Sequence, residues 1–321
     1  IGEAFPQVVW HAEAPLLRTA PAPLYLLSRL VRENGYKVVL SGEGADEVLG
    51  GYDIFKEAKI RRFWAAAPDS GRRPLLLQRL YPYLSNLQRL SPDYLQRFFQ
   101  ISPDALQSPF FSHLPRWNMT KGLKVFFSDH LQRELSDYSC EEELRSSLPD
   151  EFDQWPAFCQ AQYLEASGLM PGYILSSQGD RMSMGHSVEG RFPFLDHRVV
   201  EFAAGLPVNL KMRGLNEKYI LKRAVADLLP DEVLERTKQP YRAPDAVSFL
   251  PGPQGPPPPD YVNELLDRKC VEQYGLFRSE AVDKLVAKAR QGKITGTRDN
   301  MAFVGILSTQ LLVRQFISPK R

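Results

Sequence analysis

Apolar residues recur at spacings of three and four along most of the chain, which is the pattern of helices that pack on one face. The first such segment runs from Pro23 to Asn34, with proline at its start and Gly35 just beyond its end. The same spacing predicts further helices over 75–90, 92–100, 157–169, 197–204, 217–228 and about 299–316. The pattern therefore predicts a helix-rich protein in which strands are scarce.

Two short apolar runs suit strands. Gln7–Trp10 and Lys37–Leu40 are rich in valine, and the second run is expected to be a buried strand. The glycine-containing loop Ser41–Ala45 follows it, and Asp46 and Glu47 come at the first turn of the next element. Helix, strand, glycine-rich turn and acidic helix start form the unit of a parallel α/β sheet, whose ligands bind outside the carboxyl ends of the strands.

Composition narrows the class of protein. The 321 residues include 40 Lys+Arg and 38 Asp+Glu, which gives a formal net charge of +2. That balance excludes a protein that binds nucleic acid or a membrane surface through its overall charge. No apolar run approaches the roughly 18 residues that span a bilayer, and three cysteines without a C-x-x-C pair favour a reducing, cytoplasmic compartment. Seven prolines in residues 243–260 predict a long surface loop.

The loop from Ser41 to Glu47 (SGEGADE) carries the first candidate chemistry. Its alternate glycines let the backbone turn sharply and point N–H groups at one spot, where a phosphate can bind. Carboxylates among such donors make sense if Mg²⁺ lies between acid and phosphate, because a hard cation takes both kinds of oxygen. The alternative is an ordinary strand-to-helix turn in which Asp46 and Glu47 only complement the helix dipole.

Two later segments concentrate charge. The block 180–197 sets Asp180, Glu189 and Arg191 among apolar residues, where charges must be paired or bind something charged. A buried ion pair of Glu189 with Arg191 or Arg198 is the structural alternative. Lys218 is expected in the first turn of a helix, where it opposes the helix dipole, so it has a claim to function although exposed lysines are common. Neither an H-E-x-x-H nor a G-x-S-x-G pattern occurs, which leaves zinc and serine hydrolases unsupported.

Taken in order, these segments resemble the synthetase domain of the glutamine-dependent asparagine synthetases. The similarity rests on residues 38–47 (VVLSGEGADE) with 50–52 (GGY), on the block 180–197, and on residues 217–222 (EKYILK). It implies a helix-rich α/β fold whose parallel sheet is of the adenine nucleotide alpha hydrolase-like (PP-loop ATPase) type, with 1–321 as one synthetase domain. The same domain occurs in β-lactam synthetases and lasso-peptide cyclases.

The resemblance also implies ATP and Mg²⁺ as cofactors and gives roles to individual residues. Adenylation of a carboxylate builds negative charge on phosphate oxygens, which a preorganised lysine and a metal stabilise. The resemblance places ATP against Ser41 and Gly42, the reacting carboxylate beside Glu43, Mg²⁺ on Asp46, the developing α-phosphate charge at Lys218, and the acceptor pocket at Asp180 and Glu189.

The family carries two parts that this sequence does not match. One is a glutaminase domain with an N-terminal cysteine, and the other is a Ser-Gly-Gly-x-Asp-Ser loop, the PP-loop part, that grips pyrophosphate. Ile1 is not a cysteine, and only forty residues precede Ser41. We therefore expect a sheet that is incomplete at the N-terminus, with these parts upstream in a longer product or on another chain; a degenerate homologue is the third explanation. A sheet without its first strands would leave apolar faces uncovered.

The predicted function is ATP-dependent amide formation. A small-molecule carboxylate, with aspartate as the first candidate, would be adenylated and then attacked by ammonia derived from glutamine, and the isolated chain would be inactive. Two alternatives stay open: an amidotransferase or cyclase that acts on another carboxylate in secondary metabolism, and a non-catalytic interaction module that keeps the fold. A homodimer is compatible with the sequence, and neither a nucleic acid nor a membrane partner is expected.

Overall fold

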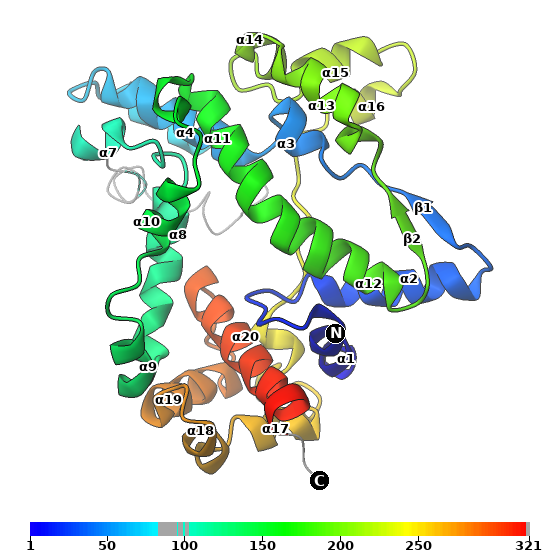
Figure 1. Ribbon diagram of the computed structural model, residues 1–321, viewed down its shortest axis with the longest axis vertical. Helices are drawn as coiled ribbons and strands as arrows, with labels where there is room; N and C mark the ends of the chain where they lie inside the picture. Colours follow the sequence, from blue (N-terminus) through cyan, green and yellow to red (C-terminus); the bar gives the residue numbers. More distant parts are fainter. Residues whose placement is uncertain (83–94, 96–98, 100–102, 319–321) are drawn as a thin grey trace.

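The computed structural model describes residues 1–82, 95, 99 and 103–318, and helices dominate this part of the chain (Figure 1). Before residue 150 the helices are η1 (Gly2–Ala4), α1 (Phe5–Ala12), α2 (Pro21–Glu33), α3 (Ala45–Leu49), α4 (Asp53–Ala65), η2 (Arg73–Arg79), α7 (Pro103–Gln107), α8 (Leu114–Lys121), η3 (Gly122–Phe126), α9 (Asp129–Glu134) and α10 (Cys140–Ser146).

The later helices complete the fold. They are η4 (Phe152–Gln154), α11 (Ala157–Leu164), η5 (Glu165–Asp180), α12 (Arg181–Met184), η6 (Pro193–Leu195), α13 (His197–Ala204), α14 (Val208–Lys211), α15 (Tyr219–Ala224), α16 (Asp231–Leu234), η7 (Ala246–Ser248), α17 (Asp260–Leu265), α18 (Arg268–Tyr274), α19 (Ser279–Arg290), α20 (Thr297–Leu312) and η8 (Val313–Ile317).

Several predicted helices are confirmed, and one predicted strand is wrong. The segments 23–34, 197–204 and 299–316 correspond to α2, α13 and α20 with its continuation η8. Gln7–Trp10 is not a strand but lies inside α1. The reason is visible in its neighbours, because Phe5, Val8, Val9 and Ala12 are buried at helical spacing along one face.

Two other predicted helices are shorter or fall largely outside the described residues. The segment 217–228 is helical only over α15. Of the segment 75–90 the structure describes 75–82, where the 3₁₀ helix η2 ends at Arg79, and almost all of 92–100 lies outside the described residues.

A long helix crosses the molecule and links its two halves (Figure 1). It consists of α11, the π-helix η5 and α12 in direct succession, so the helix predicted over 157–169 continues to Met184. Pro171 lies within η5. Because proline lacks a backbone N–H, Pro171 removes one hydrogen bond from this helix.

The described strands form a small parallel sheet. β1 (Val38–Leu40) pairs with β2 (Glu189–Arg191), with Val38 opposite Glu189 and Leu40 opposite Arg191. This pairing brings the first and second sequence motifs side by side, although Val39 and its partner Gly190 lie 151 positions apart in the sequence, since 190 − 39 is 151. The prediction of a helix-rich α/β fold with a parallel sheet is therefore confirmed.

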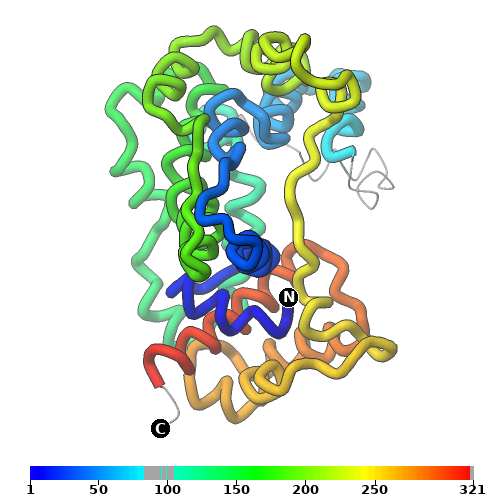
Figure 2. The backbone as a smooth tube through the Cα atoms, turned by 90° about the vertical axis from the view of Figure 1, so that its right-hand side faces the viewer, coloured from blue at the N-terminus to red at the C-terminus, as the bar shows by residue number. Residues whose placement is uncertain are grey.

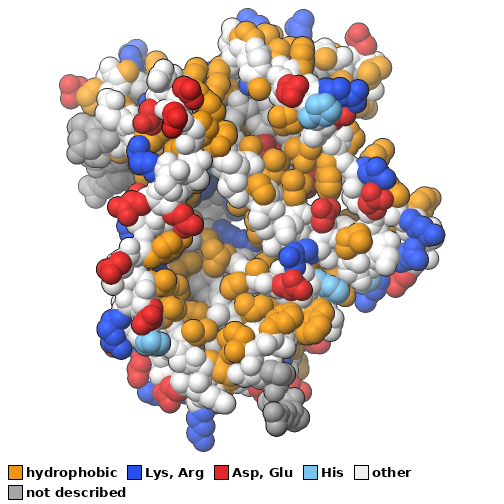
Figure 3. Space-filling view, in the orientation of Figure 1, with side chains coloured by type: hydrophobic (Ala, Val, Ile, Leu, Met, Phe, Trp, Pro, Cys, Tyr) orange, Lys and Arg blue, Asp and Glu red, His pale blue; other side chains and the backbone are white. Residues whose placement is uncertain are grey.

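β1 is not the buried strand that its sequence predicted. Leu40 is 79% exposed and Val38 is 47% exposed, and Leu27 and Leu30 on α2 are also exposed. The physical reason is that, among the residues that the structure describes, β1 has a paired strand on one side only, so its apolar side chains lack a cover. Hydrophobic side chains also remain on the surface around α13 (Figure 3), where Phe202 is exposed.

The largest core lies in the lower half of Figure 1, where α1, α17, α19 and α20 pack around buried phenylalanines. The proline-rich segment 243–260 belongs partly to this core. Residues 253–257 are exposed as predicted, but Ala246, Phe249 and Leu250 are buried, so the segment is a surface loop only in its middle. The chain between α16 and η7 runs extended from the upper to the lower half (Figure 2).

Candidate active site

The loop after β1 is held by β2 and by the residues that follow it. The backbone N–H of Ser41 donates to the carbonyl of Arg191 at 2.9 Å, so the first motif begins in fixed register with the second. Gly44 has a φ of +90°, and a Cβ there would lie 2.2 Å from Leu195 Cδ2, so glycine is required at this turn. Gly42 is exposed, with nothing within 4 Å of where a Cβ would stand. The backbone there is open to a ligand.

Asp46 lies at the centre of the site, between two lysines from distant parts of the chain. Lys218 Nζ is 3.0 Å from its Oδ1, and Lys238 Nζ is 2.6 Å from its Oδ2. All three side chains are mostly buried, with 17% of Asp46, 21% of Lys218 and 18% of Lys238 exposed. The carboxylate rests on Gly51, where an added Cβ would stand 1.9 Å from Oδ1. One carboxylate thus organises two cations beyond the carboxyl end of β1.

Lys218 reaches Asp46 from an uncommon backbone conformation. It is the N-cap of α15 rather than a residue of its first turn, and its φ of 49° and ψ of 35° are left-handed. That conformation costs a non-glycine residue roughly 1 kcal/mol, so surrounding contacts must hold it. The positive charge near the positive end of α15 is balanced by Asp46.

Glu43 lies within the electrostatic reach of the same cluster. Its backbone N–H donates to Ser41 Oγ at 3.3 Å. Partial burial raises the pKa of its carboxyl, the negative charge of Asp46 raises it further, and the ammonium of Lys238 opposes both. A partly buried carboxyl with a raised pKa beside a cationic cluster is typical of a functional site.

Lys238 is the site residue that the sequence did not reveal. It lies in the extended chain between α16 and η7, and its ammonium also lies 5.5 Å from the centre of the Tyr52 ring. Around Lys238 the sequence has no helical or strand period, and a single lysine before Gln239-Pro240 carries no motif. Only the path of the chain across the fold brings it to Asp46.

Glu47, the neighbour of Asp46, serves to fix α3. Its buried carboxylate accepts a hydrogen bond from the Tyr52 hydroxyl at 2.6 Å, and burial raises its pKa. Gln162 on α11 donates to the backbone carbonyl of Glu47 at 2.7 Å, and Lys211 on α14 donates to the Gln162 side-chain oxygen at 3.2 Å. The helix that carries Asp46 is therefore tied to two other helices.

Replacing Lys211 by methionine should raise the stability of the folded protein at pH 7. Burial lowers the pKa of the Lys211 ammonium below its ordinary 10.5, and the ammonium donates to the neutral amide of Gln162. At pH values between the lowered pKa of Lys211 in the folded protein and its ordinary pKa in the unfolded chain, the unfolded chain binds more protons. Wild-type stability therefore rises with pH through this window. Thermal melts from pH 7 to 10 should show a gain of roughly 1–2 kcal/mol at pH 7 that shrinks as the pH rises.

Lys284→Met provides the matched control, because Lys284 is exposed on α19. Its melting temperature should follow that of the wild type at every pH. A loss of stability in Lys211→Met at pH 7 would contradict the argument.

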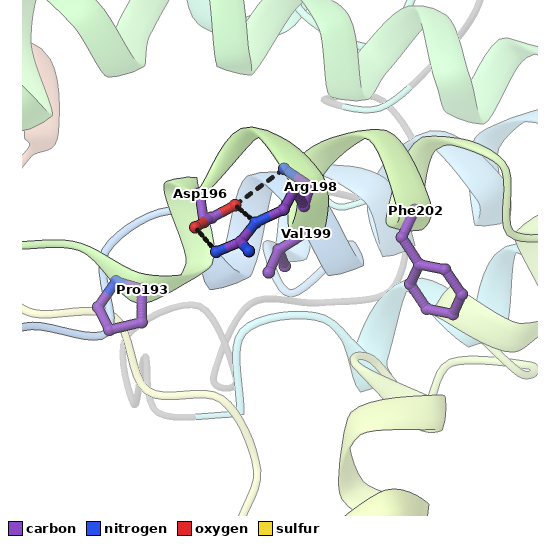
Figure 4. Close-up of a pocket in the computed structure, with 5 residues that line it drawn as sticks. All are labelled: Pro193, Asp196, Arg198, Val199 and Phe202. Atoms are coloured by element: carbon purple, nitrogen blue, oxygen red, sulfur yellow. Dashed lines mark hydrogen bonds and ion pairs between the residues drawn. The ribbon is translucent and has the colours of Figure 1, made fainter.

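The second motif contributes structure around the loop. The Oδ1 of Asp196 accepts from the Arg198 backbone N–H at 2.9 Å and so caps α13, and its carboxylate binds the Arg198 guanidinium at 2.7 Å (Figure 4). These bonds from Arg198 hold the pKa of Asp196 well below its usual range. Because Leu195 precedes this cap and packs on Gly44, the cap fixes the wall of the first loop.

The two residues predicted for the acceptor pocket lie outside the lysine cluster. Asp180 is exposed at the end of η5. Glu189 pairs with Arg191 at 3.0 Å, but both side chains are more than half exposed, so the expectation of a buried pair is wrong. The reason is the same uncovered sheet that exposes β1. Their role toward an acceptor stays a prediction.

A metal at this site would need ligands from outside the described chain. Among the described residues, no group of three or more His, Cys, Asp or Glu side chains is arranged to hold a metal ion. Asp46 nevertheless fits Mg²⁺ in one way, because this ion is often held by one or two carboxylates together with substrate phosphates.

Within the described ranges, no helix is both long and apolar enough to cross a membrane.

Comparisons with known proteins agree with the motifs. The sequence profile of asparagine synthase matches residues 1–314. The chain is 30% identical over 305 residues to "Amidase chyE" of Penicillium rubens, which covers 90% of this chain and 44% of that protein. It is 28% identical over 244 residues to "Asparagine synthetase [glutamine-hydrolyzing] 1" of Bacillus subtilis, which covers 74% of this chain and 35% of that protein. The chain thus spans less than half the length of these relatives.

Proposed function

Because the chain belongs to the asparagine synthase family, as its motifs predicted, we propose that it supplies part of the site for ATP-dependent amide formation. In this reaction a carboxylate oxygen attacks the α-phosphorus of ATP, an acyl-adenylate forms and pyrophosphate leaves. Ammonia then attacks the acyl carbon, and AMP leaves as the amide forms. The parallel sheet would be of the PP-loop ATPase type.

The placement of Asp46 between Lys218 and Lys238 is the observation that carries the proposal. Two mostly buried ammonium groups with one carboxylate carry a net positive charge, which favours a polyphosphate. When phosphate oxygens arrive, the lysines can exchange the carboxylate for phosphate, and Asp46 is the residue that would then hold Mg²⁺. Lys218 would then face the charge that develops at the α-phosphate, where a preorganised cation acts most strongly.

Mg²⁺, when bound, would neutralise the pyrophosphate as it leaves. The remaining tasks fall to the chain itself. Ser41 and Gly42 would present the open backbone of the loop to ATP. Glu43, whose pKa is raised, is proposed to lie beside the carboxylate substrate, next to the cluster of Asp46, Lys218 and Lys238. Asp180 and Glu189 are proposed to face the acceptor from the neighbouring segment.

The acceptor and the source of nitrogen are further parts of the proposal. Similarity to glutamine-hydrolysing asparagine synthetases favours aspartate and ammonia from glutamine. Similarity to the fungal proteins named amidases favours an amidotransferase that acts on another carboxylate. Three groups of the reaction kept together argue against a non-catalytic module, because Glu43, Asp46 and Lys218 would have no reason to stay clustered.

The proposed site is completed by a PP-loop portion and a glutaminase, either elsewhere in the same protein or on another chain. Support comes from the uncovered apolar side chains of β1 and α2, which a further strand would bury. On this view the chain alone has little or no turnover.

Pyrophosphate release tests the function. The complete protein, supplied with ATP, Mg²⁺, glutamine and one carboxylic acid at a time, should release pyrophosphate with aspartate or with one other acid and not without acid. No release with any acid would contradict adenylation. Robust turnover by residues 1–321 alone would contradict the partial site.

A further inference from the structure

A buried ion cluster forms around Glu217, the residue immediately before Lys218. Glu217 is 4% exposed, and its Oε2 lies 2.7 Å from Lys56 Nζ on α4. Lys56 also lies 3.3 Å from Asp53 Oδ1, and Lys222 Nζ lies 3.1 Å from Glu217 Oε1. The carboxylate immediately before Lys218 is therefore held by cations on both of its oxygens.

Helix α4 also contacts the turn that precedes Lys218 at a second point. Lys59 Nζ on α4 donates to the carbonyl of Gly214 at 2.9 Å, one helical turn away from Lys56. Within the turn, Arg213 and Asn216 exchange two backbone hydrogen bonds of 3.0 Å. Residues 213–217 are thus a closed loop fastened to α4 at two points.

This fastening explains the conformation of Lys218. Its left-handed backbone is unfavourable for lysine, and such a residue persists only where its surroundings over-determine it. Glu217 fixes the chain before it, and the hydrogen bond from the Lys222 N–H to the Lys218 carbonyl at 3.0 Å fixes the chain after it. Burial raises the pKa of Glu217, but hydrogen bonding and charge from Lys56 outweigh burial and lower it, so the Glu217 carboxyl is ionised at neutral pH.

We propose that Glu217, anchored by Lys56, is a positioning residue that holds Lys218 in its left-handed conformation and so aims the ammonium at the site of Asp46. The inference rests on the proposed function only for its effect on catalysis, because the aim of Lys218 can be measured without any substrate.

Competitive acetylation of the complete protein measures that aim. Limiting acetic anhydride, followed by mass spectrometry, reports the reactivity of Lys218 and, as an internal reference, of Lys238, which pairs with the other oxygen of Asp46. In Glu217→Gln the reactivity of Lys218 should rise about tenfold, the worth of a lost hydrogen bond to a charged group, while that of Lys238 changes less than about twofold. Equal changes at both lysines, or no change at Lys218, would overturn the proposal.

Glu165→Gln is the matched control. Glu165 is also buried, and its Oε1 lies 3.3 Å from His113 Nε2, a partner that does not belong to the 213–217 turn. This variant should lose stability and leave Lys218 reactivity unchanged, which separates a general loss of packing from a loss of aim. Should Glu217→Gln fail to fold, Lys56→Gln removes the other end of the anchor and must give the same selective rise at Lys218.

Kinetics extend the test to catalysis. Glu217→Gln should lower the rate of pyrophosphate release about tenfold with little change in the KM for ATP. The double variant with Lys218→Ala should be no slower than Lys218→Ala alone, because both changes remove the same effect. If the double variant were instead slowed by the product of the two single effects on the rate, the positioning role would be overturned. If the wild-type protein releases no pyrophosphate, the proposed function is refuted. The acetylation experiment would still test the positioning role of Glu217, because it needs no substrate.

Discussion

Lys218→Ala should slow adenylation by a factor of hundreds or more. The ammonium lies 3.0 Å from Asp46 on a turn that is fastened to α4 through Glu217, so the backbone need not rearrange when the side chain turns to the charge that develops on the phosphate. Loss of such a charge costs about 3 kcal/mol in the transition state. The initial rate of pyrophosphate release by the complete protein, at saturating ATP and acid, measures the effect.

The KM for ATP should change much less than the rate, because the lost interaction strengthens only as the reaction proceeds. Lys284→Ala removes an exposed lysine from α19 and should leave the rate at the wild-type value. A rate for Lys218→Ala that stays close to wild type would make Lys218 a surface residue with no part in the chemistry.

Asp46 and Lys218 could each be predicted as site residues from the sequence, through the resemblance of their motifs to the asparagine synthetases, whereas their contact could not. Both belong to motifs whose local pattern is unusual: carboxylates after a glycine turn, and a lysine where a helix begins. Such patterns cost free energy of folding unless tertiary contacts compensate for them, so they indicate residues that interact with distant parts of the chain. The structure brings the two side chains into contact, and their roles in catalysis remain predictions.

Lys238 and the anchor of Lys218 could not be anticipated in the same way. Lys56 looks like any polar residue of a helix, and nothing in its neighbourhood says that it pairs with Glu217, 161 positions later, since 217 − 56 is 161. Lys238 lies on an extended chain without periodicity. Long-range ion pairs depend on how helices cross, which local pattern does not encode.

The two predicted strands also show what local sequence cannot determine. Four valine-rich residues at 7–10 suit a strand by propensity, yet Phe5 and Ala12 extend their pattern into a buried helical face, and burial wins over propensity. The run 37–40 contains the strand β1 as expected, but whether a strand is buried depends on its neighbours, and within the described part of the chain β1 pairs with β2 on one edge only. Propensity predicts the element, while the partners decide its environment.

Asp46→Asn should abolish the Mg²⁺ dependence of phosphate binding at this site. In the wild type the carboxylate separates two ammonium groups and would hold the metal once they turn to phosphate. The amide is a poor ligand for Mg²⁺ and leaves both lysines unpaired, so the variant should bind metal-free pyrophosphate more tightly than the wild type does. Titration calorimetry of the complete protein with pyrophosphate, with and without Mg²⁺, measures both effects.

The same substitution should lower adenylation at least about a hundredfold and reduce stability by roughly 1–3 kcal/mol, because two mostly buried cations lose their shared partner. Asp129→Asn is the control, since Asp129 forms an exposed pair with Arg278 at 2.6 Å, and it should alter neither binding nor melting temperature. If Asp46→Asn kept the wild-type Mg²⁺ dependence, Asp46 would serve only to pair the lysines, and the metal would have to be held by other groups. The two outcomes therefore separate a carboxylate that binds the metal from one that merely arranges Lys218 and Lys238.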